Sequence, residues 1–320
     1  MKRALVFALG LLSGFLPCAA WSQADYPSKP IRMVVGFPPG GGNDIIARLL
    51  SAKLQEAWGQ SVVVDNRPGA NSNIAIEAVA KAAPDGYTLL FNAAGMVINP
   101  AMYENFPVDT IRDFEPISQV ATFPFVFAVH PSVPARSVKE FIALAKSQPG
   151  KMNYAAGAAA FQFAAELFKQ QAGIDIKHIP YKGSVQAISA VLGNDVQATI
   201  VDSLPATAHI SSGKLRALAV TSAKRATALP EVPTMMEAGV ADFDISGWAG
   251  LFAPAGTPKP VIAKLTQQTV KIVQTPEFRE KLLALGSEPV GSSGEELAAI
   301  MKSQLPRFKA VAKTANIKAE

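Results

Sequence analysis

The stretch from Val34 to Leu50, VVGFPPGGGNDIIARLL, combines an apolar strand, a turn rich in proline and glycine, and the start of a helix. β-Branched residues favour the strand, and Ile46 and Leu50, four residues apart, lie on one face of a helix. Glycines let the backbone turn sharply and let a ligand approach the main chain closely. The stretch therefore predicts a β–turn–α unit whose corner is a candidate anion site.

Strand, loop and helix follow one another in this order along the chain. The first set of expected elements comprises strands at 31–37, 61–65 and 87–92 and helices at 44–58, ended by Gly59, and at 73–82. A second set runs from about Thr122 to Asp242, after which a strand at 245–254 returns to the first set. Two or three helices follow, and the last begins at a Ser293/Glu296 capping box. Successive βα units imply a parallel sheet with helices on its faces.

The restart of this pattern divides the expected α/β fold into two lobes. Lobe 1 comprises residues 25–121 and 245–320, and lobe 2 comprises residues 122–244. The chain then crosses between the lobes twice, near 119–125 and near 242–247. Two lobes on a double hinge enclose a cleft, so this is where we expect a ligand.

Residues 1–24 have the three parts of a secretory signal peptide. A positive start is followed by an apolar core at 4–16, too short to span a membrane, and Ser22 and Ala24 are the small residues before a cleavage site. Cleavage after Ala24 removes Cys18, the only cysteine, so the mature chain forms no disulfide. No later stretch is long and apolar enough to cross a membrane, and we expect an exported protein without a membrane anchor.

The charge balance is mildly basic. The chain has 30 Lys and Arg against 25 Asp and Glu, and loss of Lys2 and Arg3 with the signal peptide leaves 28 against 25. The positive residues are scattered and form no block with interleaved aromatic residues, so nucleic acid is not an expected partner. The balance is compatible with small acidic ligands.

Ligands of open parallel sheets bind beyond the carboxyl ends of the strands, and this rule selects one group of loops in each lobe. The candidate ligand-binding residues in these loops are Phe37, Pro38, Gly40, Gly41, Asn43, Asp44, Ala70, Asn71, Ser72, Ala93, Ala158, Ala159, Phe161, Tyr181 and Asp202. A ligand between the two groups would be held from both sides.

Several of these residues have two interpretations. The loop at 40–42 could hold a carboxylate with backbone N–H groups, or it could be a tight turn capped by Asn43 or Asp44. Asp202 could accept a hydrogen bond from a ligand or from the opposite lobe, or it could cap the helix that follows it. Tyr181 could line the cleft or pack at a strand end, and an ion pair or solvation is expected for Arg48.

Catalytic and metal-binding patterns are scarce. The three histidines, His130, His178 and His209, are far apart and lack metal-ligand spacing. The chain contains no Gly-x-Ser-x-Gly elbow, and the mature chain has no cysteine nucleophile. We therefore expect no catalytic residue, no metal and no cofactor.

Seven stretches carry a family resemblance over nearly the whole mature chain. They are YPSKPIRMVVGFPPGGGNDIIARLL, VVVDNRPGANSNIA, APDGYTLLF, IPYKGS, LRALAVTSAKR, LPEVPTMMEAG and GWAGLFAPAGTP. In order and spacing they resemble the Bug family, the extracytoplasmic receptors of tripartite tricarboxylate transporters. The resemblance implies a periplasmic-binding-protein (Venus flytrap) architecture, a periplasmic location, a monomer and no enzymatic activity. It also implies a small carboxylate ligand, gripped by the loops at 37–44 and 69–72, and membrane subunits of a tripartite transporter as partners.

The chain departs from the family pattern at three places. Asn43 stands where the family usually has Thr or Ser, and Asn71-Ser72 stand where it usually has Gly-Gly. In lobe 2, Ala158, Ala160 and Phe161 lie in a shortened loop that in the family often carries a hydroxyl and a histidine. We therefore expect an aromatic or short aliphatic monocarboxylate to bind better than citrate. The alternative function is a secreted α/β enzyme, such as a hydrolase, with an unrecognised site.

Overall fold

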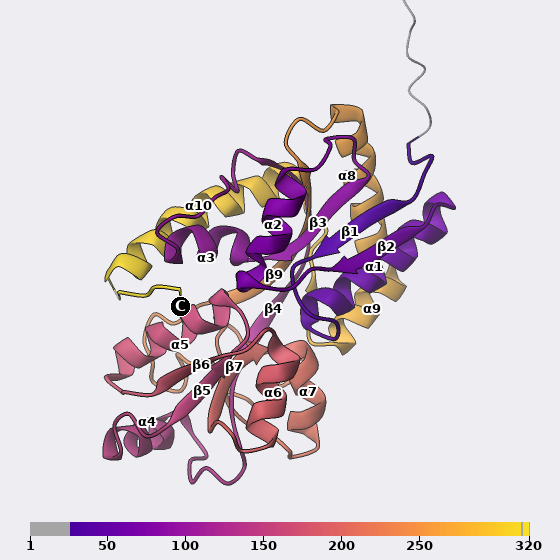
Figure 1. The fold of residues 1–320 in the computed structure, drawn as a ribbon. Helices are drawn as coiled ribbons and strands as arrows, with labels where there is room; N and C mark the ends of the chain where they lie inside the picture. Colours follow the sequence, from indigo (N-terminus) through magenta and orange to yellow (C-terminus); the bar gives the residue numbers. More distant parts are fainter. Residues whose placement is uncertain (1–25, 315, 320) are drawn as a thin grey trace, which may run out of the picture.

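Two bodies lie one above the other, and a mixed β-sheet runs through both (Figure 1). The computed structural model describes residues 26–314 and 316–319, so the expected signal peptide and Cys18 lie outside the described residues. The C-terminal segment lies between the two bodies, beside α3 and α5. Among the described residues, no helix has both the length and the apolar character that a membrane span requires.

The upper body is built around three parallel strands and a returning strand. The strands are β1 (Ile31–Val35), β2 (Val62–Asn66), β3 (Thr88–Ala93) and β9 (Ser246–Pro254). β1 pairs in parallel with β2 and β3, which confirms the two predicted βα units. β9 pairs with β3 in antiparallel orientation, so the sheet as a whole is mixed.

The upper body contains the helices that the sequence predicts at 44–58 and 73–82, and three helices follow the returning strand, where two or three are expected. The helices of the upper body are α1 (Gly42–Trp58), the short helix η1 (Ala70–Ser72), α2 (Asn73–Ala80), α3 (Gly95–Met102), α8 (Lys259–Val273), α9 (Pro276–Ala284) and α10 (Gly294–Thr314). α10 begins at the predicted capping box, in which the Ser293 amide donates to Glu296 at 2.7 Å and the Glu296 amide donates to the Ser293 hydroxyl at 3.1 Å. Helix α3 was not predicted from the sequence.

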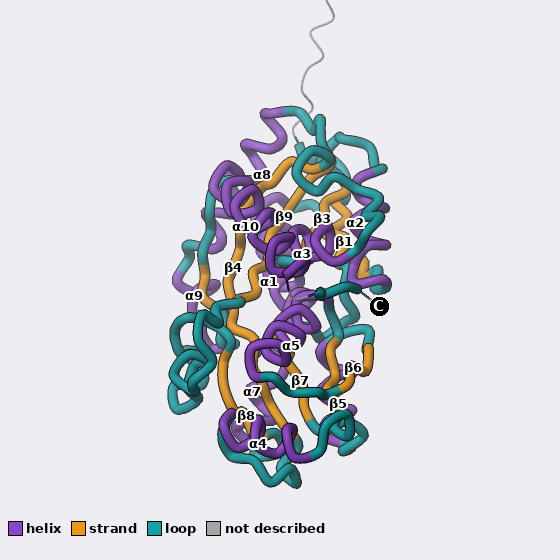
Figure 2. The backbone as a smooth tube through the Cα atoms, turned by 90° about the vertical axis from the view of Figure 1, so that its left-hand side faces the viewer, coloured by secondary structure: helices purple, strands orange, loops and turns teal. Residues whose placement is uncertain are grey.

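One long strand, β4 (Phe114–Val129), joins the two bodies. Its first part, up to Pro124, pairs with β9, and its last part, from Phe125, pairs with β7 and β8. The strand order is β2-β1-β3-β9-β4-β7-β5-β6, and the short strand β10 (Glu288–Pro289) also pairs with β4. Figure 2 shows β4 passing from the upper into the lower body as continuous strand. The first expected crossover is therefore part of a β-strand.

The second crossover lies beside the first, and Thr221 connects them. The Thr221 amide donates to the Phe125 carbonyl, and the Ile245 amide donates to the Thr221 carbonyl, both at 3.0 Å. The Thr221 hydroxyl accepts from the Phe125 amide at 3.2 Å and donates to the Ile245 carbonyl at 2.6 Å. The division of the chain into lobes at 121/122 and 244/245 stays a prediction.

The lower body repeats the strand–loop–helix pattern. Its elements are α4 (Val138–Ser147), β5 (Asn153–Ala156), α5 (Ala159–Ala172), β6 (Lys177–Pro180), α6 (Ser184–Leu192), β7 (Ala198–Asp202), α7 (Ser203–Ser211) and β8 (Arg216–Val220). Phe127 of β4 packs at the centre, with its ring 4.9 Å from Phe141 and 5.2 Å from Phe168. The apolar core continues into the upper body through Phe163 and Phe308, whose rings are 5.2 Å apart.

Candidate functional site

A cleft of about 580 Å³, part of it open to solvent, lies between the two bodies. Ten of the fifteen candidate residues line it: Phe37, Pro38, Gly41, Asn43, Asn71, Ala93, Ala158, Ala159, Phe161 and Asp202. The other five are not among its lining residues: Gly40, Asp44, Ala70, Ser72 and Tyr181. The structure thus brings loops from both expected lobes together, and the ligand-binding roles of these residues stay a prediction.

Glycines begin helix α1 at the edge of this cleft. Its N-cap is Gly41, which has no side chain to cap the helix, and the expectation that Asn43 or Asp44 caps it is wrong because both lie inside the first turn. The Gly40 amide donates to the Asp44 carboxylate at 2.9 Å, and the Gly42 amide donates to the Asp202 carboxylate at 2.9 Å. The corner is therefore a turn held by two carboxylates, one of which comes from the lower body.

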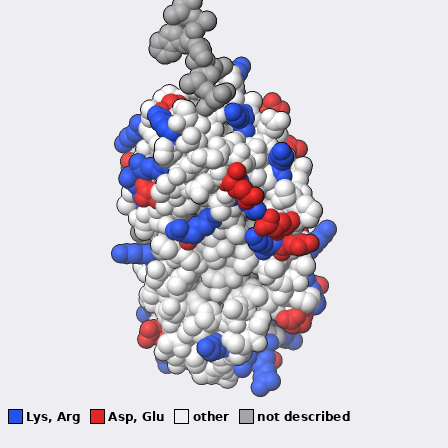
Figure 3. Space-filling model, turned by 90° about the vertical axis from the view of Figure 1, so that its right-hand side faces the viewer, with Lys and Arg blue, Asp and Glu red and all other residues white. Residues whose placement is uncertain are grey.

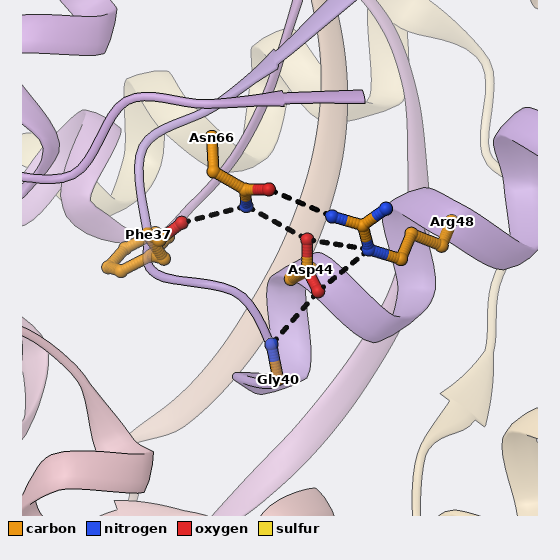
Figure 4. Close-up of polar contacts among 5 residues, drawn as sticks. All are labelled: Phe37, Gly40, Asp44, Arg48 and Asn66. Atoms are coloured by element: carbon orange, nitrogen blue, oxygen red, sulfur yellow. Dashed lines mark hydrogen bonds and ion pairs between the residues drawn. The ribbon is translucent and has the colours of Figure 1, made fainter. Parts of the chain in front are cut away.

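Asp44 holds the glycine loop from within the upper body (Figure 4). Besides the Gly40 amide, its carboxylate accepts hydrogen bonds from Arg48 Nε at 2.9 Å and from Asn66 Nδ2 at 2.8 Å. Asn66 Nδ2 also donates to the Phe37 carbonyl at 2.9 Å. Burial acts to raise the pKa of Asp44, but these donors outweigh it and lower the pKa. The expected ion pair of Arg48 is confirmed, and Asp44 positions the loop.

The second loop of the upper body has an unusual backbone. Ala70, Asn71 and Ser72 all have positive φ, at 45°, 54° and 73°, which L-residues rarely adopt. Asn99 Nδ2 donates to the Asn71 carbonyl at 2.7 Å, and Asn71 Nδ2 donates to the Tyr103 hydroxyl at 2.8 Å. These contacts from α3 and its end hold the loop in this conformation. Asn99 also lines the cleft, and sequence reasoning missed it because α3 was not predicted.

Asp202 reaches across the cleft from the end of β7. It is the N-cap residue of α7, as one of the two interpretations expects, but its side chain makes no capping hydrogen bond. The alternative of a contact to the opposite lobe is confirmed, since Oδ2 accepts from the Gly42 amide of the upper body. Asp202 is 3% exposed, and its Oδ1 has no hydrogen-bond partner among the described residues. Burial raises the pKa of Asp202, and the nearby Ser184 hydroxyl and the hydrogen bond from the Gly42 amide oppose that rise.

Aromatic rings form an apolar wall of the cleft. The rings of Phe125 and Phe161 meet edge to face at 4.8 Å, and Phe123 lies 6.3 Å from Phe125. Gly247 of β9 lets these rings approach, because a Cβ there would lie 2.3 Å from the Phe123 ring. Sequence reasoning missed Phe123, Phe125 and Gly247 because they lie within strands. The alternation of Phe123 and Phe125 in ATFPFVF was the available signal, since residues two apart share a face of a strand.

The cleft contains little charge. Among the described residues, its lining includes no Lys, Arg or His, and its only acidic residue is Asp202. The nearby helices α6 and α7 also lack Lys, Arg, Asp and Glu. Figure 3, which views the face on the right of Figure 1, shows charged side chains over the upper body and few across the middle of the lower body. A bound anion would therefore meet backbone and neutral groups rather than cationic side chains.

Two α/β bodies that enclose a buried cleft at the ends of their strands form the periplasmic-binding-protein architecture, in agreement with the predicted fold class. Such proteins are solute-binding receptors. Residues 46–317 match the family described as "Tripartite tricarboxylate transporter family receptor". The chain belongs to this family.

Known proteins with high similarity agree with this assignment. The chain is 36% identical over 319 residues to Protein BugT of Bordetella pertussis, and the match covers 98% of each sequence. Its structure is similar to that of Rpa4515 of R. palustris with adipate, with a TM-score of 0.89, 34% identity and coverage of 92% of this chain and 99% of that one. It is also similar to MatC of Rhodopseudomonas palustris with bound malate, with a TM-score of 0.86, 27% identity and coverage of 89% and 99%.

Proposed function

We propose that this chain is a periplasmic receptor that captures a small carboxylate in the cleft and delivers it to the membrane subunits of a tripartite transporter. The family supports the receptor role, and the adipate and malate of two structural neighbours support the ligand class. The two bodies would act as lobes, of residues 25–121 with 245–320 and of residues 122–244, that close on the ligand. We propose that it acts as a monomer and not as an enzyme, because the members of this family are receptors.

One observation on the structure supports a carboxylate as the ligand. Four helices, α1, α3, α5 and α6, begin at the cleft, and none has a side chain that caps its N-terminus. The first turn of a helix has unpaired N–H groups and the positive end of the helix dipole. Four such ends, two from each body, favour an anion where the lining has no cationic side chain.

Binding of matched compounds tests this proposal. We expect adipate or hexanoate to raise the melting temperature of the chain that starts at Asp25, and calorimetry to give saturable binding. Adipamide, which is neutral and of the same length as adipate, should bind much more weakly. Mass spectrometry should recover each compound unchanged, and conversion of a compound would favour the alternative of a secreted enzyme.

A glycine substitution tests the location of the site. A Cβ at Gly41 would meet its nearest neighbour, the Pro38 carbonyl, at 3.6 Å, so a larger side chain there projects toward the cleft without a clash in the fold. Gly41→Val should abolish carboxylate binding and leave the melting temperature of the free protein nearly unchanged. Gly193→Val, at an exposed site outside the cleft, should leave binding intact. Unchanged affinity of Gly41→Val would mean that the ligand binds elsewhere.

A further inference from the structure

The cleft poses an electrostatic problem for a receptor of carboxylates. In the part of the chain that the structure describes, Asp202 is the only acidic lining residue and is buried, and no lining residue is cationic. Two carboxylates in one buried site repel each other, and such pairs resolve the repulsion by holding a proton between them. The structure therefore has to provide a position for that proton.

The two oxygens of Asp202 are in different environments. Oδ2 accepts the hydrogen bond from the Gly42 amide at 2.9 Å, as a carbonyl-type oxygen does. Oδ1 is buried and has no partner among the described residues, while the residue lines the cleft. A proton on Oδ1 would leave the contact with Gly42 intact and would give Asp202, which lines the cleft, one hydrogen-bond donor.

We propose that Asp202 binds the ligand as a carboxylic acid, with Oδ1–H donating to the ligand's carboxylate, so that each ligand is captured together with one proton. The proton comes from the solvent and bonds to Oδ1, and no bond of the ligand breaks. This inference rests on the proposed function, because it requires that the ligand carries a carboxylate.

Among the described residues, the elements packed around Asp202 place no compensating charged side chain beside it. On α1, Asp44 and Arg48 are paired with each other. Lys182, before α6, is exposed, and His209 lies two turns along α7. The adjacent part of β4 and the start of α5 contribute Phe125 and apolar residues at 158–161. Consistent with this, burial raises the pKa of Asp202 and no neighbouring charge contributes to the shift.

The direction of the pH dependence follows from the contact between the bodies. Opening the cleft breaks the bond from Gly42 to Asp202 and exposes the carboxyl to water, where its pKa returns toward the ordinary value. The closed complex, in which burial raises the pKa, binds the proton more tightly. Above about pH 6, where the ligand stays ionised, affinity should therefore fall as pH rises, by up to about tenfold per pH unit for one linked proton.

Calorimetry on the wild-type protein tests the proton directly. Hexanoate and adipate are titrated between about pH 6 and 8.5, where ordinary carboxylic acids remain ionised, in buffers with different ionisation enthalpies. We expect up to one proton to be taken up per ligand, and a dissociation constant that rises with pH. Binding without proton uptake and without pH dependence would overturn the inference and leave the proposed function standing.

Asp202→Asn is the decisive variant because asparagine imitates the protonated acid. Its carbonyl can accept from the Gly42 amide, and its NH₂ group then occupies the position of Oδ1–H. We expect Asp202→Asn to bind hexanoate at pH 8 at least as tightly as the wild type does, without proton uptake. Asp202→Ala, which lacks the donor, should bind hexanoate about tenfold more weakly than Asp202→Asn does, or worse, and without proton uptake.

Two outcomes of these experiments distinguish a failure of the inference from a failure of the proposed function. If Asp202→Asn weakens binding at every pH, the ionised form of Asp202 binds a donor of the ligand, and the inference is wrong while the receptor function stands. If neither the wild type nor the variants bind any carboxylate at any pH, the proposed function is wrong and the inference falls with it.

Discussion

Asp44 and Asp202 are two buried carboxylates beside the start of α1, and their surroundings act on them in opposite directions. Asp44 accepts from Arg48, Asn66 and the Gly40 amide, which stabilise its charge. Asp202 has no cation beside it, and its Oδ1 lacks a partner among the described residues. One carboxyl group therefore holds a loop in place as an anion, while the other is suited to carry a proton.

Asp44 should make stability depend on pH. Its pKa in the folded protein lies below that of an exposed carboxyl, so the folded protein binds a proton less readily than the unfolded chain. Its contribution is complete at pH 7 and is lost as pH falls through the folded-state pKa, below about 4. We expect Asp44→Asn to lower the free energy of unfolding by about 1–2 kcal/mol at pH 7, and by less at pH 3.

Urea denaturation at both pH values measures this effect. Asp195→Asn is the matched control, because Asp195 is exposed, and its effect should stay within about 0.5 kcal/mol at both. An equal loss for Asp44→Asn at pH 7 and pH 3 would mean that the charge of Asp44 does not stabilise the loop.

At the level of single residues, the sequence predicted which residues line the cleft better than it predicted which residues they contact. The rule for strand ends selected Asp202, and the structure places it in the cleft. Its hydrogen-bond partner, Gly42, is 160 residues away in the chain, and no pattern of neighbouring residues predicts such a contact. Phe123 and Phe125 were missed because a rule based on strand ends excludes residues within a strand.

Among the secondary-structure elements, local signals decided which ones were predictable. The Ser293/Glu296 capping box and the glycine after α1 marked helix ends correctly, because capping depends on neighbouring residues alone. Helix α3 gave no such signal, since GMVINPAM is apolar except for Asn99 and contains Pro100, which disfavours a helix interior. Its formation depends on burial, which tertiary packing provides.

Thr221 connects the two crossovers, and its hydroxyl should be important for stability. The hydroxyl is fully buried, accepts from Phe125 of β4 and donates to the Ile245 carbonyl before β9. Thr221→Val keeps the size of the side chain but leaves the Ile245 carbonyl without that donor. We expect a loss of about 1–3 kcal/mol in the free energy of unfolding, measured by urea denaturation.

Thr269→Val provides the matched control for this substitution. Thr269 is also fully buried, but its hydroxyl has no hydrogen-bond partner among the described residues. Its replacement by Val should be neutral or stabilising, because a buried hydroxyl without a partner is itself unfavourable. A similar loss for both variants would show that the contacts of Thr221 contribute nothing specific.

For the molecule as a whole, the cleft determines which ligands fit. The wall formed by Phe123, Phe125 and Phe161 and the alanines at 158–160 offers few partners to a ligand with several charges. Each buried polar group left unpaired costs roughly 1–3 kcal/mol, about one to two orders of magnitude in affinity. We therefore predict that benzoate or hexanoate binds better than citrate.

A panel measured by thermal shift and confirmed by calorimetry tests this preference. The largest stabilisation by citrate would contradict it and would mean that backbone N–H groups or water molecules serve the far end of the cleft. Tricarballylate, which lacks the hydroxyl of citrate, separates the effect of the hydroxyl from that of the three carboxylates.

The two bodies should unfold together, because their core is continuous. Phe163 of α5 and Phe308 of α10 meet edge to face across the bodies, and Gln162 Nε2 donates to the Lys318 carbonyl of the C-terminal segment at 3.2 Å. Trp58 and Trp248, the only tryptophans among the described residues, both lie in the upper body. Tryptophan fluorescence therefore reports on the upper body alone, whereas far-ultraviolet circular dichroism reports on both.

We expect the two signals to give coincident thermal transitions in the wild-type protein, which is the behaviour of one cooperative unit. Phe308→Ala removes a buried ring at the contact between the bodies and should lower the free energy of unfolding by about 3–5 kcal/mol. It should also separate the two transitions, because the contact that couples the bodies is weakened. Phe141→Ala, which removes a ring from the core of the lower body alone, should reduce stability without weakening that contact. If the wild-type transitions already differ, the bodies fold independently, and the contact at Phe163 and Phe308 does not couple them.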